Sequence, residues 1–254
     1  MTNLGGIAGL WGGFQKRMWL KIASINKKNI NISSLPPMVS FTFDDAPVSS
    51  FVNGGAVLEQ FGFNGTYYVA AGLMGKITNV GQIADMEIIA HYGQRGHEIG
   101  NHTFDHMDCL KAGIESIKQN IQMNRSAMNS LISNSFAYPY GSRDARTRFA
   151  ISRCTDSARG ISFGINKGLI DLWDLKAAQV YSQNSMDDCF SLVSECAANG
   201  GWLIFYTHDV NETPSAYGCK PEEFTQLVKA VRNNYLTVAT VEKATAIVKA
   251  FRRS

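Results

Sequence analysis

The sequence lacks the signals of several common protein classes. It has five cysteines in 254 residues, an odd number with no C-x-x-C pair, which argues against a disulfide framework or a zinc knuckle and favours reduced thiols. No G-x-G-x-x-G segment and no Walker loop follows the first predicted strand, so a nucleotide site has no support. No apolar run reaches the length of a membrane-spanning helix.

Acidic residues are missing from positions 1–43, which carry five basic ones: Lys16, Arg17, Lys21, Lys27 and Lys28. The net charge of the whole chain, +3, is too small to indicate a nucleic-acid partner. We predict that residues 1–35 form a basic, helical N-terminal extension, which either packs on the main domain or contacts anionic lipid or a partner. Its apolar stretch, residues 4–14, is broken by glycines and precedes the charges, unlike a secretory signal. We therefore predict a cytoplasmic protein that could associate with the membrane through this extension.

Beyond this extension, short apolar runs rich in β-formers alternate with stretches of helical spacing. The runs are residues 39–43, 66–70, 98–101, 135–138, 160–163, 202–207 and 236–241. Between the third and fourth runs, Ile114, Ile117 and Ile121 recur on one face of a helix. Alternating strands and helices predict a parallel sheet. About seven strands favour an α/β barrel over an open sheet, in a single domain that spans residues 36–254.

Candidate functional residues follow the ends of the predicted strands, where the reactive groups of parallel α/β folds gather. Asp44 and Asp45 follow the first run, and His208 ends the penultimate one. His102 and His106 follow the third run, and their spacing of four lets two imidazoles reach one metal ion. A histidine pair alone is a weak signal, but two histidines and an aspartate at matching strand ends predict a metal site.

These segments resemble the NodB-homology polysaccharide deacetylases, carbohydrate esterase family 4. The first family motif, T-F-D-D, corresponds to residues 42–45, and the second, H-[S/T]-x-x-H, to residues 102–106. The third, Pro-aromatic-Gly, corresponds to residues 139–141, and the fifth, an apolar run ending in L-x-H or a close variant, resembles residues 203–208. The resemblance covers roughly residues 38–245 and implies a distorted (β/α) barrel of about seven strands.

The resemblance also implies a hydrolase that acts on carbon–nitrogen bonds of an N-acetylated amino sugar. Asp45, His102 and His106 would hold a divalent metal, in the first place zinc, with nickel, cobalt or manganese as alternatives. Asp44 would be the general base that activates the attacking water. His208 would be the general acid that protonates the departing amine, which an amide needs because its leaving group is poor.

Tyrosines of the third motif are the implied sugar contacts. The backbone N–H of Tyr140 would stabilise the oxyanion, and Tyr138, Pro139 and Tyr140 would bind substrate. Tyr67 and Tyr68 could also stack on a sugar, but they point to opposite faces of one strand, so at least one is expected in the core.

Two motifs depart from the family pattern. Many members carry an arginine two residues before the proline of the third motif, where it orients the catalytic aspartate, and here that position is Ala137. Three nearby arginines could replace it, although each also fits a basic helix face: Arg143, Arg146 and Arg148. The aspartate of the fourth motif, which tunes the acidic histidine, has no clear match. Asp171 or Asp174 could be its remnant, although helix capping explains them equally, and Asp209 fits a turn.

Several functions stay open. The F-A-Y-P-Y-G version of the third motif resembles the branch that acts on poly-N-acetylglucosamine and related bacterial glycans, which points to cell-surface glycan biosynthesis. The absence of a secretion signal favours a glycan precursor, a lipid-linked sugar or a small nucleotide-sugar-like molecule over mature wall polymer. Alternatives are a deformylase or an O-acetyl esterase on a related carbohydrate, or a glycan-binding module with a decayed active site.

Overall fold

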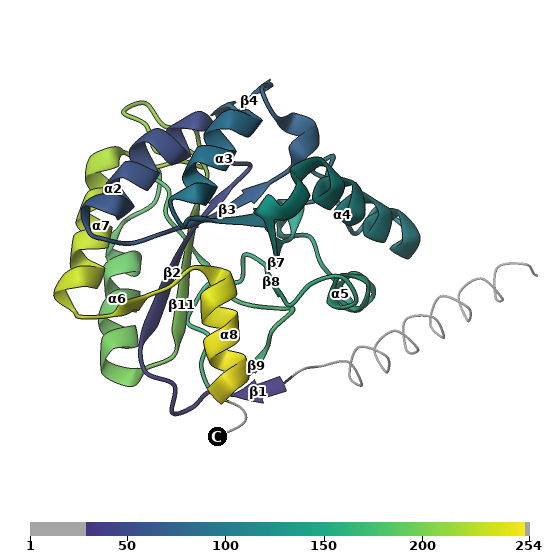
Figure 1. Cartoon of the computed structure of the whole chain (residues 1–254). Helices are drawn as coiled ribbons and strands as arrows, with labels where there is room; N and C mark the ends of the chain where they lie inside the picture. Colours follow the sequence, from purple (N-terminus) through teal and green to yellow (C-terminus); the bar gives the residue numbers. More distant parts are fainter. Residues whose placement is uncertain (1–28, 252–254) are drawn as a thin grey trace, which may run out of the picture.

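A curled parallel sheet of eight strands organises the chain in the computed structural model, which describes residues 29–251 (Figure 1). Seven strands follow one another in the spatial order β10-β11-β2-β3-β6-β7-β8, and the short β12 also pairs with β2. The strands are β2 (Met38–Asp44), β3 (Thr66–Val69), β6 (Glu98–Asn101), β7 (Ile132–Ala137), β8 (Ser157–Arg159), β10 (Ala178–Gln179), β11 (Trp202–Thr207) and β12 (Thr237–Val238). A further parallel bridge joins Arg159 to Leu175, shortly before β10. The sheet therefore curls most of the way round, which confirms the predicted distorted barrel in a single domain.

Helices cover the outside of this sheet. Figure 1 shows α2, α3, α6 and α7 along one side and α4 and α5 beyond the strands β7 and β8. The helices are α2 (Ala56–Gln60), α3 (Met86–Gln94), α4 (Ile114–Met128), α5 (Ala145–Ser152), α6 (Asp187–Asn199), α7 (Pro221–Asn233) and α8 (Val241–Phe251). Within the described part of the chain, none of them combines the length and apolar character needed to cross a membrane.

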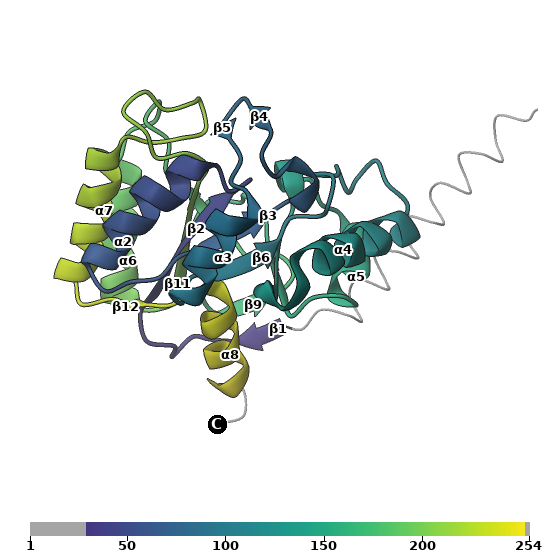
Figure 2. The ribbon, with the colours of Figure 1, turned by 45° about the horizontal axis from the view of Figure 1, so that its top comes forward.

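Two small antiparallel sheets complete the described structure. β4 (Ile77–Thr78) and β5 (Gly81–Gln82) form a hairpin that stands at one end of the barrel (Figure 2). β1 (Asn29–Asn31) pairs with β9 (Leu169–Asp171), and Ile30, Ile32 and Leu35 are buried against the domain. The rest of the predicted extension, residues 1–28, lies outside the described residues, so its membrane contact stays a prediction.

The central strand β2 shows why these residues form a barrel. Phe41 and Phe43 point outward into the core beneath the helices, where both pack on Phe224 of α7. Ser40 and Thr42 point the other way, and their hydroxyl groups donate to backbone carbonyls of neighbouring segments. Both faces are thus buried, as in most parallel sheets.

The expected strands agree with the structure except near three places. The strand predicted at 160–163 lies earlier, as β8, because Ile161 and Phe163 are exposed at 44% and 52% rather than buried. The run at 236–241 contains only the two-residue β12. β10, also two residues long, was not predicted, because so short a strand leaves no periodic pattern.

Candidate active site

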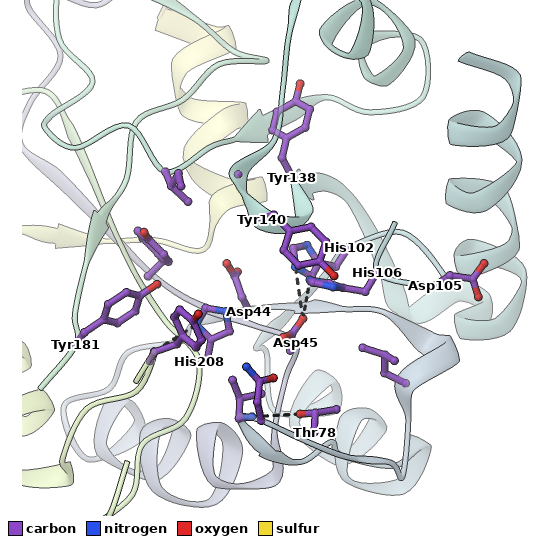
Figure 3. Close-up of a pocket in the computed structure, with 17 residues that line it drawn as sticks. Asp44, Asp45, Thr78, His102, Asp105, His106, Tyr138, Tyr140, Tyr181 and His208 are labelled. Atoms are coloured by element: carbon purple, nitrogen blue, oxygen red, sulfur yellow. Dashed lines mark hydrogen bonds and ion pairs between the residues drawn. The ribbon is translucent and has the colours of Figure 1, made fainter. Parts of the chain in front are cut away.

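The carboxyl ends of neighbouring strands from β11 to β7 bring the predicted residues to one pocket of about 490 Å³. Thr207 of β11 lies beside Phe43 of β2, and Val69 of β3 lies beside Asn101 of β6. The residues that follow these strands therefore meet. The pocket is lined, among others, by Asp44, Asp45, His102, His106, Tyr138, Tyr140 and His208 (Figure 3).

A sharp bend separates the two adjacent aspartates. Asp44 is the last residue of β2, and the next two residues, Asp45 and Ala46, have φ of 59° and 56°. Such left-handed conformations are uncommon outside glycine and store strain that surrounding contacts must hold. This bend lets both adjacent carboxylates reach one site.

Left-handed backbone is concentrated at this site. In the described residues, seven non-glycine positions have positive φ, and five belong to the segments that carry the site: Asp45, Ala46, Thr103, His106 and Tyr140. Buried asparagines hold the histidine loop in this form. Asn101 accepts from the N–H of Thr103 (2.9 Å), and Asn120 of α4 accepts from the N–H of Asp105 (3.1 Å).

Asp45, His102 and His106 form a cluster whose ligand atoms lie within 4.8 Å of one another. Asp45 Oδ1 lies 3.6 Å from His102 Nε2 and 3.2 Å from His106 Nε2. The Nδ1 of His102 lies 2.9 Å from the carbonyl oxygen of Ala137. A carbonyl can only accept, so Nδ1 carries the hydrogen and Nε2 presents its lone pair to the cluster.

This donor set fits a divalent cation. Asp45 Oδ1 is buried without a hydrogen-bond donor among the described residues, a costly arrangement unless something positive binds there. Burial lowers the pKa of His102 to about 3 and also lowers the pKa of His106, so both imidazoles are neutral at physiological pH. Burial raises the pKa of Asp45 to about 6. Two neutral imidazoles and a carboxylate are typical ligands of zinc and related metals.

Asp44 is paired with an arginine that the sequence had not indicated. The guanidinium Nη2 of Arg159, at the end of β8, donates to Asp44 Oδ1 in a buried ion pair. Burial alone would raise the pKa of Asp44, but the positive charge of Arg159 brings it below its ordinary value. Asp44 is therefore ionised near neutral pH.

Aromatic rings enclose this arginine. Arg159 is fully buried, with its guanidinium carbon 5.0 Å from the ring centroid of Tyr68 and 4.9 Å from that of Tyr206. Stacking on two rings stabilises a guanidinium that has lost its water. Gly100 makes room for one of them, because a Cβ at this position would lie 2.6 Å from the Tyr68 ring.

The three arginines proposed to replace the family arginine serve elsewhere. Arg143 pairs with Asp174 and also donates to the carbonyl of Gly141 (3.1 Å). Arg148 bridges Asp174 and Asp171 (2.9 and 3.3 Å). Arg146 donates to loop carbonyls, including that of Leu110 (2.9 Å). These pairs also occupy both aspartates that were considered for the fourth motif, so neither serves His208.

A backbone carbonyl, rather than a carboxylate, faces the Nδ1 of His208. This nitrogen lies 3.3 Å from the carbonyl oxygen of Tyr217, and the imidazole lies between the rings of Tyr181 and Tyr217, with centroids at 6.2 and 5.5 Å. In Figure 3, Asp44 lies between His208 on one side and the pair of His102 and His106 on the other. Asp44 thus lies between His208 and the two histidines of the aspartate–histidine cluster (Figure 3).

The tyrosines considered as sugar contacts differ in how far their side chains are exposed. Tyr140 is 65% exposed and packs edge-on against His106, so its ring is open to a ligand. The stacking role expected for Tyr138 does not fit its packing, because its side chain is 1% exposed and its hydroxyl donates to the carbonyl of Trp173. Tyr67 and Tyr68 are both fully buried.

Pro139 is also buried, and it starts the short turn η4 (Pro139–Gly141) that places Tyr140. Its side chain is absent from the pocket lining in the described part of the chain. Tyr181 and Tyr217, which the sequence had not indicated, line the pocket instead, and Tyr217 is 44% exposed. No motif marks these two tyrosines, so only the fold could reveal them.

Solved structures of known proteins share this fold at low sequence identity. The chitin deacetylase of the fungal pathogen Colletotrichum lindemuthianum is 17% identical, with a TM-score of 0.61 over 84% of this chain and 89% of that one. The Xyl-CE4 domain of a multidomain xylanase from the hindgut metagenome of Trinervitermes trinervoides is 17% identical, with a TM-score of 0.57 over 85% and 92%. PdaA of Bacillus subtilis, a family 4 carbohydrate esterase, is 14% identical, with a TM-score of 0.57 over 90% and 88%. At these identities the likeness shows the fold alone.

The sequence also matches a family model over part of the chain. No curated protein sequence matches the chain. The family model described as polysaccharide deacetylase matches residues 32–155, the stretch that holds the first three motifs and the whole aspartate–histidine cluster. This segment makes up just under half of the chain, and over it the chain is similar to the polysaccharide deacetylase family.

Proposed function

We propose that this chain is a metal-dependent hydrolase that removes N-acetyl groups from an amino sugar, in a polysaccharide or a glycan precursor. One observation carries the proposal: the cluster of Asp45, His102 and His106 shares a pocket with Asp44 and His208. The match of residues 32–155 to the polysaccharide deacetylase model supports the deacetylase activity. The fungal chitin deacetylase and the other structures of this fold are consistent with a carbohydrate substrate.

The cluster of Asp45, His102 and His106 would hold the metal, with zinc as the first expectation and nickel, cobalt or manganese as alternatives. When bound, such a metal polarises the acyl carbonyl and lowers the pKa of water. The positive charge of the metal would compensate Asp45 Oδ1, which is buried and has no hydrogen-bond donor among the described residues.

The neighbouring groups of the chain supply the proton transfers. Asp44 is ionised and held through Oδ1 by Arg159, which leaves Oδ2 to take a proton from the attacking water. His208, on the other side of Asp44, gives a proton to the departing amine. The backbone N–H of Tyr140 stabilises the oxyanion, and its exposed ring contacts the sugar.

Metal analysis and an activity screen on the purified chain test this function. We expect one divalent metal per chain and acetate release from chitooligosaccharides or another N-acetylated sugar. Asp44→Asn should retain the metal and lose activity by about 10²- to 10⁴-fold, the usual contribution of a general base. His106→Gln should lose metal as well as activity. Glu115→Gln, an exposed charge on α4, is the matched control and should change neither.

Other outcomes of the screen would assign a different function. Formate release from formylated sugars would indicate a deformylase, and acetate release only from O-acetylated xylan an esterase. Bound metal without hydrolysis of any acylated sugar would leave a glycan-binding module. The decayed-site alternative was motivated in part by the alanine at position 137, where many family members carry an arginine. Arg159 supplies a cation to Asp44 instead, which weakens this motive.

The predicted cytoplasmic location and the membrane contact of residues 1–35 stay predictions. Both depend chiefly on residues 1–28, outside the described structure.

A further inference from the structure

The segment after His208 returns to the end of β11 as a loop. The N–H of Cys219 donates to the carbonyl of Asp209 (3.0 Å), and the N–H of Asn211 donates to the carbonyl of Cys219 (3.0 Å). These two bonds close the loop at its base. The loop thereby carries Tyr217 back beside His208, and the two rings lie 5.5 Å apart.

The carbonyl of Tyr217 is the partner of the His208 side chain. Its oxygen accepts from the backbone N–H of His208 (3.0 Å) and from the Thr207 hydroxyl (3.2 Å), and it lies 3.3 Å from His208 Nδ1. Because a carbonyl cannot donate, this contact requires the hydrogen on Nδ1. The Nε2 atom is then the one left for the pocket, and the orientation of the imidazole depends on the position of this carbonyl.

Asp209 anchors the loop through its buried carboxylate. It is 3% exposed, and its Oδ2 accepts from the N–H of Ser215 (2.8 Å) while its Oδ1 accepts from the Ser215 hydroxyl (2.5 Å). The Ser215 hydroxyl oxygen in turn accepts from the N–H of Tyr217 (3.1 Å). Gly218 allows this close packing, because a Cβ there would lie 2.3 Å from Asp209 Oδ1.

We propose that Asp209 is a positioning residue, which acts through Ser215 and Tyr217 to fix the tautomer and orientation of His208. A buried carboxylate with two donors from one serine restrains that serine, and the serine restrains the backbone N–H of Tyr217, the residue whose carbonyl meets Nδ1. The inference rests on the proposed function, in which His208 is the acid. It adds a residue that contacts neither the pocket nor the reacting atoms.

Kinetics of four variants test the chain of contacts. In Asp209→Asn one acceptor oxygen becomes an NH₂ group that opposes the donors of Ser215, so kcat should fall by about 10- to 100-fold, the scale of a misplaced catalytic group. The KM should stay near that of the wild type. Ser215→Ala keeps the charge of Asp209 but removes the bridge, and it should give the same loss, whereas Ser215→Thr should recover activity. Glu212→Gln removes a charge from an exposed position of the same loop and is the matched control.

Histidine ¹⁵N chemical shifts test the same proposal without turnover. In the wild type the shifts of His208, assigned with His208→Gln, should report the Nδ1–H tautomer, and in Asp209→Asn and Ser215→Ala they should move towards a mixture. If both variants keep the ¹⁵N shifts of His208 and the kcat of the wild type, with unchanged melting temperature and metal content, the proposal is overturned. A loss in Asp209→Asn alone would also overturn it, in favour of a direct effect of the charge. If no sugar is hydrolysed, the proposed function fails, and the shifts still decide the positioning role.

Discussion

At the residue scale, the site depends on a charge pair in the interior of the barrel. Arg159 is fully buried and Asp44 is 5% exposed, so both charges have lost nearly all of their water. Each compensates the other, and the rings of Tyr68 and Tyr206 cover the faces of the guanidinium. The pair keeps the proposed base ionised in a place where burial alone would protonate it.

Removing one member of this pair should destabilise the fold more than removing both. We expect Arg159→Met to lower the free energy of unfolding by about 3–5 kcal/mol, because Asp44 is left as an unpaired buried charge. The double variant with Asp44→Asn should regain a large part of this loss. Urea denaturation of the two single variants and the double variant, with a chelator present throughout, measures the coupling. Strictly additive effects would show that the two side chains do not interact.

Sequence reasoning found the acidic and histidine members of the site but not this arginine. Asp44, Asp45, His102 and His208 could be placed because each follows a predicted strand and lies on a motif. The substitute for the missing arginine was sought near Ala137 in sequence. It comes from the next strand, β8, and reaches its partner across the barrel, which only the tertiary structure specifies.

At the element scale, the predicted positions of strands and helix faces were incomplete where polar residues are buried together with apolar ones. β8 contains Ser157 and Arg159, both of which are fully buried although they are polar. A search for apolar runs therefore placed the predicted strand too late, at residues 160–163. In α4 the apolar face was recognised, yet Asn120 and Asn124 also lie on it and hold the neighbouring loops. Two asparagines four residues apart within an apolar stripe were the available signal.

A buried histidine joins three elements and should make stability depend on pH. The Nδ1 of His97, just before β6, accepts from the N–H of Gly65 before β3 (3.0 Å), and its Nε2 lies 3.2 Å from Glu59 of α2. Burial lowers the pKa of His97 in the folded state, even though Glu59 acts to raise it. The unfolded chain, with a pKa near 6.5, therefore binds more protons at acidic pH. The contribution of His97 to stability is full above about pH 6.5 and is lost as the pH falls towards the folded-state value.

Urea midpoints at pH 8, 6 and 5 measure this effect. His97→Asn places an amide oxygen near the position of Nδ1, so it can keep the bond to Gly65 without taking up a proton. We expect a smaller loss of stability on acidification in this variant than in the wild type. His91→Asn, on the exposed side of α3, is the matched control for the loss of a histidine. The idea fails if wild type and His97→Asn lose stability in parallel.

At the scale of the whole molecule, the alternation of strands and helices was sufficient to predict the barrel. Long elements with one dominant period, such as β2 and α4, were placed within a few residues, and Ile117 and Ile121 of the face expected on α4 are buried. Two-residue strands such as β10 carry no such period and exist because neighbouring strands hold them in register. The site follows from the barrel, since parallel strands deliver their carboxyl ends to the same edge.

The reactivity of the five cysteines measures how often the buried cores of the domain open to solvent. Cys109, Cys189, Cys196 and Cys219 are buried, whereas Cys154 is partly exposed. Burial raises the pKa of Cys109 and Cys219 to about 12 and of Cys189 to about 11, and only the thiolate reacts with a thiol reagent. At pH 8 we therefore expect one fast-reacting thiol in the native protein and five after denaturation. Cys154→Ser should abolish the fast phase, and fast labelling of a second native thiol would mean that one of the cores opens readily.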